Sequence, residues 1–220
     1  MKELVLFGTA ELAQVAYYYF THDSDYEVVA FTVDAGYIKE DKFCDLPVVP
    51  FENLISQYPP DIYELFIALA YSKVNAFRKG KYLHAKALGY KLASYISTRA
   101  TVLNQYQIGD NCFILEDNTI QPFSTIGNNV TLWSGNHIGH HSVIEDHAFI
   151  SSHVVISGGV KIGEQCFIGV NAALRDHISV GDRCIIGAGA LLLSDAEPDG
   201  LYIGAETKRS ELPASKLKRI

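Results

Sequence analysis

The sequence predicts a small α/β domain followed by a parallel β-helix. From Ile108 to Leu192 every sixth residue is aliphatic, and the same phase extends back to Val102 and Ile96. A period of six fits neither an α-helix nor an ordinary hairpin meander, but it is typical of a β-helix built from short strands and corners. Before this stretch, strand-like segments alternate with helix-like segments, which favours a parallel sheet.

Each hexad follows one pattern around its aliphatic residue, and three hexads close a triangular coil of eighteen residues. The residue four positions after the aliphatic one is usually small. The residue directly after it is glycine in seven hexads: Gly109, Gly127, Gly139, Gly163, Gly169, Gly181 and Gly187. We expect the aliphatic residue to point inward, the small residue to fit the corner, and glycine to supply unusual backbone angles there.

The first third of the chain reads as alternating strands and helices. We expect strands or extended segments over Lys2–Phe7, Glu27–Val33, Pro47–Pro50, Leu65–Leu69 and Lys91–Tyr95. We expect helices over Glu11–Phe20, Phe51–Gln57 and Asn75–Leu88. The chain therefore divides into an α/β domain over residues 1–95, a β-helix over 96–195 and a C-terminal tail over 196–220.

Composition narrows the class of protein. A net charge of −7 argues against a nucleic-acid partner, because phosphate binding normally needs a basic face. The apolar runs are too short to span a bilayer and no leader opens the chain, so we expect a cytoplasmic protein without a membrane partner. Cys112, Cys166 and Cys184 take the small inward position of a hexad, and Cys44 lies in the first domain. We expect no disulfide framework.

The hexads resemble those of the left-handed β-helix acyltransferases, over about half of the chain. Together with the strand-like start Leu4–Gly8 and the helix-like segment after it, the order resembles the bacterial sugar acetyltransferases of the bacillosamine N-acetyltransferase and sialic acid O-acetyltransferase type. This resemblance implies a Rossmann-like first domain and a left-handed β-helix. It also implies a homotrimer, with acetyl-CoA bound in the groove between two neighbouring β-helices.

The same resemblance implies a catalytic base. When the hexads are aligned with the bacillosamine type, with Gly158–Gly163 as the downstream anchor, the base falls on His140. Imidazole suits this role near neutral pH. Relatives often carry an acidic residue next, whereas this chain has His141, so Asn136 and Asp176 are candidates for orienting His140. The open alternative is that His140 is an ordinary exposed corner histidine.

The expected cofactor contacts also follow from the resemblance. Main-chain groups of Gly158, Val170 and Ala188 match positions that line the acetyl-CoA groove, and the Gly158 N–H is our candidate for stabilising an oxyanion. The adenine end would lie near Ala205–Arg209. There Lys208 either meets a phosphate or belongs to a solvated basic tail.

The substrate candidates lie where strands of the first domain end. Gly8, Thr9 and Ala10 form the first strand–helix turn, Asp34 follows the second strand, and Tyr71 follows the third buried strand. Carboxyl ends of parallel strands share one edge, where ligands bind. Relatives carry a richer glycine loop at the first turn, so an ordinary tight turn remains open for Gly8. No dinucleotide fingerprint is present, and we do not expect NAD.

We therefore expect a homotrimeric, acetyl-CoA-dependent N-acetyltransferase that acts on the amine of a nucleotide-linked amino-deoxy sugar in polysaccharide or glycan synthesis. We expect a direct transfer with no acyl-carrying nucleophile and no metal. Three alternatives stay open: sugar O-acetylation on the same fold, a non-catalytic scaffold, and a metal site like that of the γ-class carbonic anhydrases. The spacing argues against the metal site, because His141, His147 and His153 are six apart and therefore lie on different faces of a coil. They cannot share one ion within a single chain.

Overall fold

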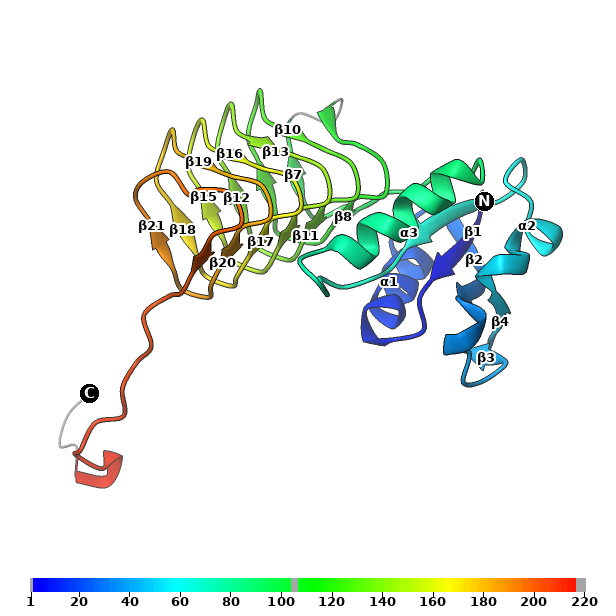
Figure 1. Ribbon diagram of the computed structural model, residues 1–220, viewed down its shortest axis with the longest axis horizontal. Coiled ribbons are helices and arrows are strands. Elements are labelled where there is room, and N and C mark those ends of the chain that lie inside the picture. The colour runs from blue at the N-terminus through cyan, green and yellow to red at the C-terminus, as the bar shows by residue number, and fades with distance from the viewer. Residues whose placement is uncertain (1, 104–106, 217–220) are drawn as a thin grey trace.

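The computed structural model describes residues 2–103 and 107–216 and has the two predicted parts in the predicted order (Figure 1). An α/β domain packs beside a β-helix, and the chain beyond the last coil extends away as a tail that ends in a short 3-10 turn, η4 (Ala214–Lys216). Among the described residues, no helix combines the length and the apolar character needed to cross a membrane.

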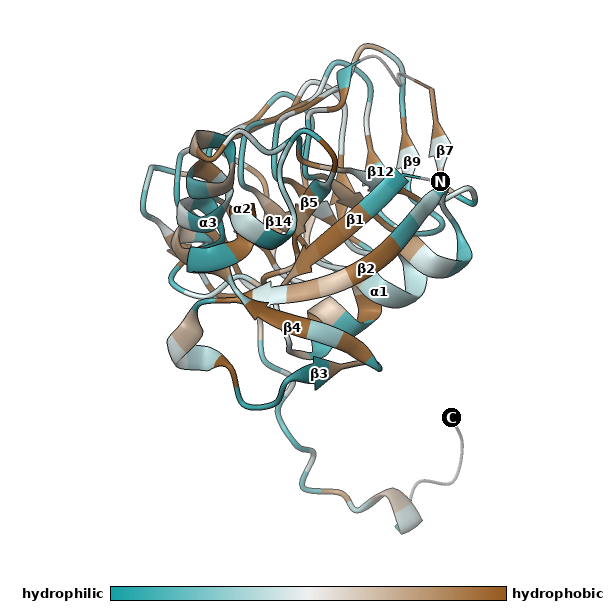
Figure 2. Ribbon diagram, turned by 90° about the vertical axis from the view of Figure 1, so that its right-hand side faces the viewer, coloured by the Kyte–Doolittle hydropathy of each residue, from teal (hydrophilic) through white to brown (hydrophobic). Residues whose placement is uncertain are grey.

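The α/β domain is built on one five-stranded sheet with the order β3-β4-β2-β1-β5. Its strands are β1 (Lys2–Phe7), β2 (Tyr26–Val33), β3 (Lys42–Phe43), β4 (Leu46–Pro50) and β5 (Glu64–Ile67). All pairs are parallel except β3 with β4 at the edge. Four consecutive residues of β1, Leu4 to Phe7, are buried, as expected for a central strand covered on both faces. Figure 2 shows β1 between β2 and β5 in this sheet.

Helices cover both faces of this sheet. They are α1 (Glu11–His22), the 3-10 turns η1 (Ala35–Tyr37) and η2 (Phe51–Asn53), α2 (Leu54–Gln57) and α3 (Ala76–Ala87). The predicted helix Phe51–Gln57 therefore begins as a 3-10 turn. The predicted strand Lys91–Tyr95 is wrong for most of its length, because only Leu92 bridges to the sheet before the chain enters the first coil.

The β-helix consists of three parallel sheets, here called faces 1, 2 and 3. Face 1 contains β6 (Tyr95–Ile96), β8 (Phe113–Ile114), β11 (Thr131–Leu132), β14 (Phe149–Ile150), β17 (Phe167–Ile168), β20 (Ile185–Ile186) and β22 (Leu201–Tyr202). Face 2 contains β7 (Thr101–Val102), β9 (Thr119–Ile120), β12 (His137–Ile138), β15 (Val155–Ile156), β18 (Ala173–Leu174) and β21 (Leu191–Leu192). Face 3 contains β10 (Thr125–Ile126), β13 (Val143–Ile144), β16 (Lys161–Ile162) and β19 (Ser179–Val180).

Three corners join these faces and recur every eighteen residues. Corner A, between faces 2 and 3, contains residues 121–123, 139–141, 157–159 and 175–177. Corner B, between faces 3 and 1, contains residues 127–129, 145–147, 163–165 and 181–183. Corner C, between faces 1 and 2, contains residues 115–117, 133–135, 151–153, 169–171 and 187–189.

The interior of the β-helix confirms the predicted direction of the hexads. The aliphatic residues from Ile114 to Leu192 and the small residues between them form one continuous buried core. Cys112, Cys166 and Cys184 are fully buried in it. Burial raises the pKa of the Cys112 and Cys166 thiols to about 12, so neither is available as a thiolate near neutral pH.

The expected reason for the hexad glycines is wrong. Positive φ falls two positions later, mostly on non-glycine corner residues such as Asn129, His141 and Gln165. Glycine is needed instead because the next coil comes close. A Cβ on Gly139 would lie 2.5 Å from the carbonyl carbon of Ser157.

The β-helix continues beyond the predicted boundary at residue 195. Ala196 bridges to Val180, and β22 adds a last strand to face 1 next to β20. The extended tail therefore begins after Tyr202, and residues 217–220 of the predicted tail lie outside the described residues.

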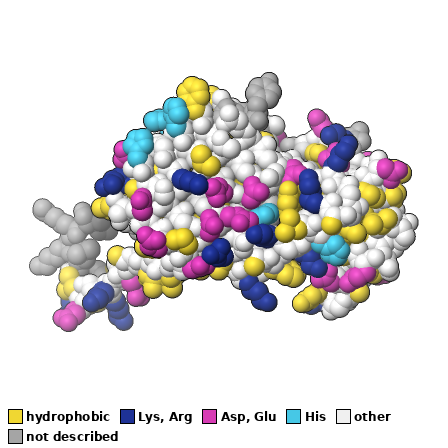
Figure 3. Space-filling model, turned by 45° about the horizontal axis from the view of Figure 1, so that its top comes forward, with side chains coloured by type: hydrophobic (Ala, Val, Ile, Leu, Met, Phe, Trp, Pro, Cys, Tyr) yellow, Lys and Arg dark blue, Asp and Glu magenta, His cyan; other side chains and the backbone are white. Residues whose placement is uncertain are grey.

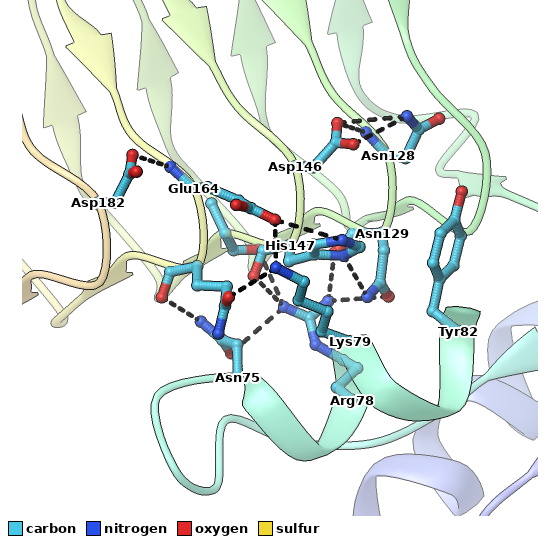
Figure 4. Close-up of polar contacts among 12 residues, drawn as sticks. Asn75, Arg78, Lys79, Tyr82, Asn128, Asn129, Asp146, His147, Glu164 and Asp182 are labelled. Carbon is cyan, nitrogen blue, oxygen red and sulfur yellow. Dashed lines mark hydrogen bonds and ion pairs between the residues drawn. The ribbon is translucent and has the colours of Figure 1, made fainter. Parts of the chain in front are cut away.

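Helix α3 fastens the α/β domain to corner B through a buried polar network (Figure 4). Arg78 is 1% exposed, and its guanidinium donates to the carbonyl oxygens of Asn129, His147 and Ala148 at 2.5, 2.9 and 3.1 Å. On the other side of the sheet, α1 packs on face 1, where the ring of Tyr19 lies 5.9 Å from that of Phe113. The two domains thus share buried contacts on both flanks.

Candidate functional site

Two cavities adjoin each other at the carboxyl edge of the α/β sheet. Cavity 1 has a volume of about 380 Å³ and lies within the α/β domain. Cavity 2 has a volume of about 870 Å³ and lies between this edge and the β-helix. Thr9, Ala10 and Leu69 line both cavities, so a ligand that fills one reaches the other. The substrate residues predicted from the sequence were placed at this same edge.

A sharp turn after β1 brings Thr9 and Ala10 to the cavities. Gly8 has φ +133°, and a Cβ there would lie 2.8 Å from the carbonyl oxygen of Ala68. Its N–H donates to the carbonyl oxygen of Thr32 at 2.8 Å. The tight turn alone therefore accounts for glycine at this position, although Gly8 also lines cavity 1.

Asp34 lines cavity 1 at the end of β2 and is held by a lysine. Its Oδ1 forms an ion pair with Lys81, whose ammonium lies 5.4, 5.5 and 5.7 Å from the ring centres of Phe7, Phe51 and Phe77. The aromatic rings and the carboxylate together fix the lysine. Within the described residues Oδ2 of Asp34 has no partner, so it can accept a hydrogen bond from a ligand hydroxyl or N–H.

Tyr71 belongs to cavity 2, where the α/β domain meets face 1. Its ring centre lies 5.0 Å from that of Phe149 and 4.7 Å from that of Phe167. Trp133 and Val170 of the β-helix line the same cavity. All five predicted substrate residues therefore lie around the two adjoining cavities.

His140 lies in corner A and is exposed. Its ring rests on the next coil, where a Cβ on Gly158 would lie 2.6 Å from Cε1 and 2.8 Å from Nε2. Its backbone N–H donates to Oε1 of Gln121 at 2.9 Å. Its Nδ1 lies 3.1 Å from Nδ1 of His141, within hydrogen-bond distance. Histidine side chains gather along the upper edge of the β-helix in Figure 3.

The backbone and a ring contact hold His141 beside His140. His141 has φ +59°, and its ring centre lies 4.7 Å from that of Phe123 in the coil before. Two coils after His141, the His177 ring covers Gly159. Asp176, a candidate partner of His140, lies 3.9 Å from Nε2 of His177 instead. His141 is therefore the side chain that meets the His140 ring.

Asn136, the other candidate partner, points into the β-helix. It is 1% exposed, its Nδ2 donates to the carbonyl oxygen of Trp133, and its Oδ1 accepts from the N–H of Val154 at 2.8 Å. The reason is its place four residues after the aliphatic of its hexad, which is the inward position. Its side chain is committed to the corner backbone and does not contact His140.

One chain does not bring all the predicted residues together. His140 and Gly158 lie in corner A and line neither cavity. Val170 and Ala188 lie in corner C, on the side of cavity 2. Lys208 is exposed and lies in the tail, which extends away from the β-helix (Figure 1). The predicted substrate residues and the predicted base therefore occupy different sides of the same β-helix.

Two lysines that line the cavities were not among the residues predicted from the sequence. Lys39 lines cavity 2 and Lys73 lines cavity 1. Each follows the carboxyl end of a strand of the α/β sheet by a few residues, which is the signal that identified Asp34 and Tyr71. The described residues contain no group of three or more His, Cys, Asp or Glu side chains arranged for a metal ion.

Comparison with known proteins agrees with this architecture. The family model described as bacterial transferase hexapeptide (six repeats) matches residues 105–140, 123–158 and 159–194. No curated protein sequence matches the chain.

Solved structures match over nearly the whole chain. A histidine-to-asparagine mutant of perosamine N-acetyltransferase from Caulobacter crescentus, in complex with CoA and GDP-perosamine, has a TM-score of 0.82 and 22% identity, over 93% of this chain and 94% of that one. The acetyltransferase domain of PglB from Neisseria gonorrhoeae has a TM-score of 0.78 and 24% identity, over 91% and 95%. WeeI from Acinetobacter baumannii has a TM-score of 0.78 and 19% identity, over 93% and 97%.

These matches confirm the predicted type of fold, a left-handed β-helix of hexapeptide repeats behind an α/β domain. They agree with the predicted acyltransferase class. At this level of identity, the residues that act must be argued from the chain itself.

Proposed function

We propose that this hexapeptide-repeat β-helix protein is an acetyl-CoA-dependent N-acetyltransferase that acts on the amine of a nucleotide-linked amino-deoxy sugar. The observation that carries the proposal is the pair of adjoining cavities. Cavity 1 has the size and polar edge for a nucleoside, and cavity 2 leads from it to the β-helix. The CoA and GDP-perosamine complex of the perosamine enzyme, and the acetyl coenzyme A complex of the PglB domain, support this choice of substrates.

The proposed site needs more than one copy of the chain. The cavities lie beside corner C and face 1, whereas His140 lies in corner A. A trimer with threefold symmetry sets corner A of one copy against corner C of its neighbour in each of three equivalent interfaces. The sugar amine held in cavity 2 of one copy then meets His140 of the next. The thioester lies in the groove between them, with Gly158 on one wall and Val170 and Ala188 on the other.

The reaction we propose is a direct transfer. Bound acetyl-CoA supplies the acetyl group as a thioester. Nε2 of His140 removes the proton from the amine as its nitrogen bonds to the acetyl carbon, and the carbon–sulfur bond breaks. The released thiolate accepts that proton from the imidazolium. The Gly158 N–H, which has no acceptor among the described residues, donates to the carbonyl oxygen on which negative charge develops.

The imidazole pair sets which nitrogen of His140 acts. We propose that Nδ1–H of His140 donates to Nδ1 of His141 across the 3.1 Å contact. The lone pair of His140 Nε2 is then free to take the amine proton. His141 takes the place that a carboxylate takes in relatives, but it brings no negative charge to the imidazolium. The base consequently works without charge stabilisation from its neighbour.

The proposed function is tested by thiol release from acetyl-CoA with UDP-, dTDP- and GDP-linked amino sugars and matched hydroxyl sugars. We expect turnover with one nucleotide-linked amine and none with its hydroxyl counterpart. Release only with a hydroxyl acceptor would assign the chain to sugar O-acetylation. If acetyl-CoA binds but none of the acceptors gives thiol release, the proposed substrate is contradicted.

The His141→Glu variant is expected to move the acidic limb of the kcat/KM–pH profile upward by about one unit. A carboxylate beside His140 stabilises its protonated form, so a higher pH is needed to keep the base unprotonated. Above that limb, turnover should stay near the wild-type rate. The measurement is kcat/KM between about pH 5 and pH 9.

The control is His84→Glu, which places the same charge at an exposed histidine of α3 that belongs to neither corner A nor corner C and lines neither cavity. Its profile should match that of the wild type. Equal shifts in both variants would point to a general charge effect and would remove His141 from its proposed role.

A further inference from the structure

The turn before α3 has a backbone that these residues rarely adopt. Lys73, Val74 and Asn75 have φ of +51°, +49° and +60°, and none of them is glycine. Positive φ is uncommon for any of these residues and is a clear outlier for a β-branched one. Three in succession form a left-handed turn, which the chain adopts only when surrounding contacts impose it.

Corner B of the β-helix imposes this conformation. Nδ2 of Asn75 donates to the carbonyl oxygens of Gln165 and Cys166, both at 3.0 Å, and the side chain is fully buried. Nε2 of Gln165 donates to the carbonyl oxygen of Val74 at 3.3 Å. At the other end of the segment, the Tyr71 ring packs on face 1. The segment is therefore fixed at both ends by the β-helix.

The left-handed turn places a lysine on the wall of cavity 1. Lys73 and Ser72 line that cavity, and Tyr71 lines cavity 2. Backbone strain that the rest of the fold maintains is typical of residues that must stand in one position for binding. Lys73 is the charged residue that this turn positions.

Two lysines of these cavities form no ion pair within the described residues, although Glu11 also lines cavity 2 and Glu40 also lines a third cavity. Three lysines of α3 have carboxylate partners: Lys79 with Glu164, Lys81 with Asp34 and Lys86 with Asp110. Lys73 and Lys39 have none among residues 2–103 and 107–216. Lys39 lines cavity 2 and a third cavity of about 250 Å³, and Thr9 lines all three. In a chain with a net charge of −7, two unpaired ammonium groups beside one turn indicate an anionic ligand.

We infer that Lys73 and Lys39 bind the diphosphate of the substrate from either side of Thr9, and that the left-handed turn serves to hold Lys73 there. This inference rests on the proposed function, because it takes the ligand to be a nucleotide sugar. With the nucleoside in cavity 1 and the sugar in cavity 2, the diphosphate crosses the residues that both cavities share. The first turn keeps one glycine, so side chains supply the charge that backbone amides supply in a glycine-rich loop.

The test compares binding of nucleosides, nucleoside monophosphates and nucleoside diphosphates by calorimetry, with guanosine, uridine, thymidine and adenosine series. For the series that binds, Lys73→Gln and Lys39→Gln should each weaken diphosphate binding by about ten-fold and nucleoside binding by less than about two-fold. Inorganic pyrophosphate should compete with the diphosphate for the wild-type protein. Lys91→Gln, an exposed lysine that lines none of the three cavities, is the matched control and should change nothing.

The backbone part of the inference has its own pair of variants. Val74→Gly should keep diphosphate binding, because glycine adopts the left-handed conformation freely. Val74→Pro cannot reach φ +49° and should lose diphosphate binding as Lys73→Gln does, while nucleoside binding persists and reports a folded cavity.

The outcomes separate this inference from the proposed function. Diphosphate binding that both lysine variants retain would overturn the inference and leave acetyl transfer untouched. Diphosphate binding that depends on the lysines, without acetyl transfer to any amine, would support the role of Lys73 and Lys39 and contradict the proposed function. Failure of every diphosphate to bind would overturn both.

Discussion

The His140→Asn variant is expected to lose at least ~10²-fold in kcat for acetyl transfer, with KM for both substrates within about three-fold of the wild type. Asparagine keeps a hydrogen-bonding side chain in corner A but cannot accept a proton from the amine. Because the His140 side chain is exposed and rests on Gly158 from outside, its loss removes no core contact. Thiol release gives kcat, and the melting temperature should stay within about two degrees of the wild-type value.

A mixing experiment tells whether His140 acts on its own chain or on a neighbour. Thr9→Trp fills the junction of the cavities and leaves corner A intact, whereas His140→Asn leaves the cavities intact. If each site combines the cavities of one copy with the base of the next, co-expression of the two variants should restore about one quarter of wild-type activity. Random assembly gives about one quarter of the sites both an intact cavity and an intact base. No restoration would place the base and the cavities in one chain and contradict the proposed trimer site. Full activity of His140→Asn alone would remove its catalytic role.

The sequence predicted the β-helix well because its core repeats in one dimension. An aliphatic every sixth residue fixes which side chains point inward, and the structure confirms this from Ile114 to Leu192. The same register places Asn136 four residues after Leu132 and hence inward, so the repeat itself contradicts the prediction that Asn136 orients His140. The backbone angles could not be predicted from the glycines, because glycine occurs both at positive φ and where another segment comes close. In this β-helix the close approach of the next coil explains the hexad glycines.

The relation between the two domains could not be predicted from the repeat. The hexads assign each residue to a corner, but they do not say which face the α/β domain covers. His140 and Val170 were expected along one groove between two neighbouring β-helices, but the repeat did not show that the cavities lie beside corner C and away from His140 in corner A. Helix α3 shows the same limit. Its charged sequence is typical of a solvent-facing helix, and nothing in it marks Arg78 as buried.

The Arg78→Met variant is expected to lose about 3 kcal/mol of unfolding free energy, the largest stability effect we predict. Burial lowers the pKa of this guanidinium to about 9, which still leaves it charged at neutral pH. Burying a charge is costly, and methionine relieves that cost. The carbonyl oxygens of Asn129 and His147 would however lose their donor while remaining buried, at about 1–3 kcal/mol each. The carbonyl oxygen of Ala148 keeps the N–H of Thr131 as a donor at 3.0 Å. The unpaired acceptors outweigh the relieved charge.

Denaturant unfolding measures this loss, and Lys86→Met on the same helix is the control. Lys86 is 45% exposed in its ion pair with Asp110, so its replacement should cost less than about 1 kcal/mol. Because Arg78 also donates to Asn75 at 3.3 Å, the variant should loosen the left-handed turn and weaken diphosphate binding along with stability. Equal stability of the two variants would mean that the carbonyls find other donors, such as water admitted between α3 and corner B. The buried guanidinium would then not be what joins the α/β domain to the β-helix.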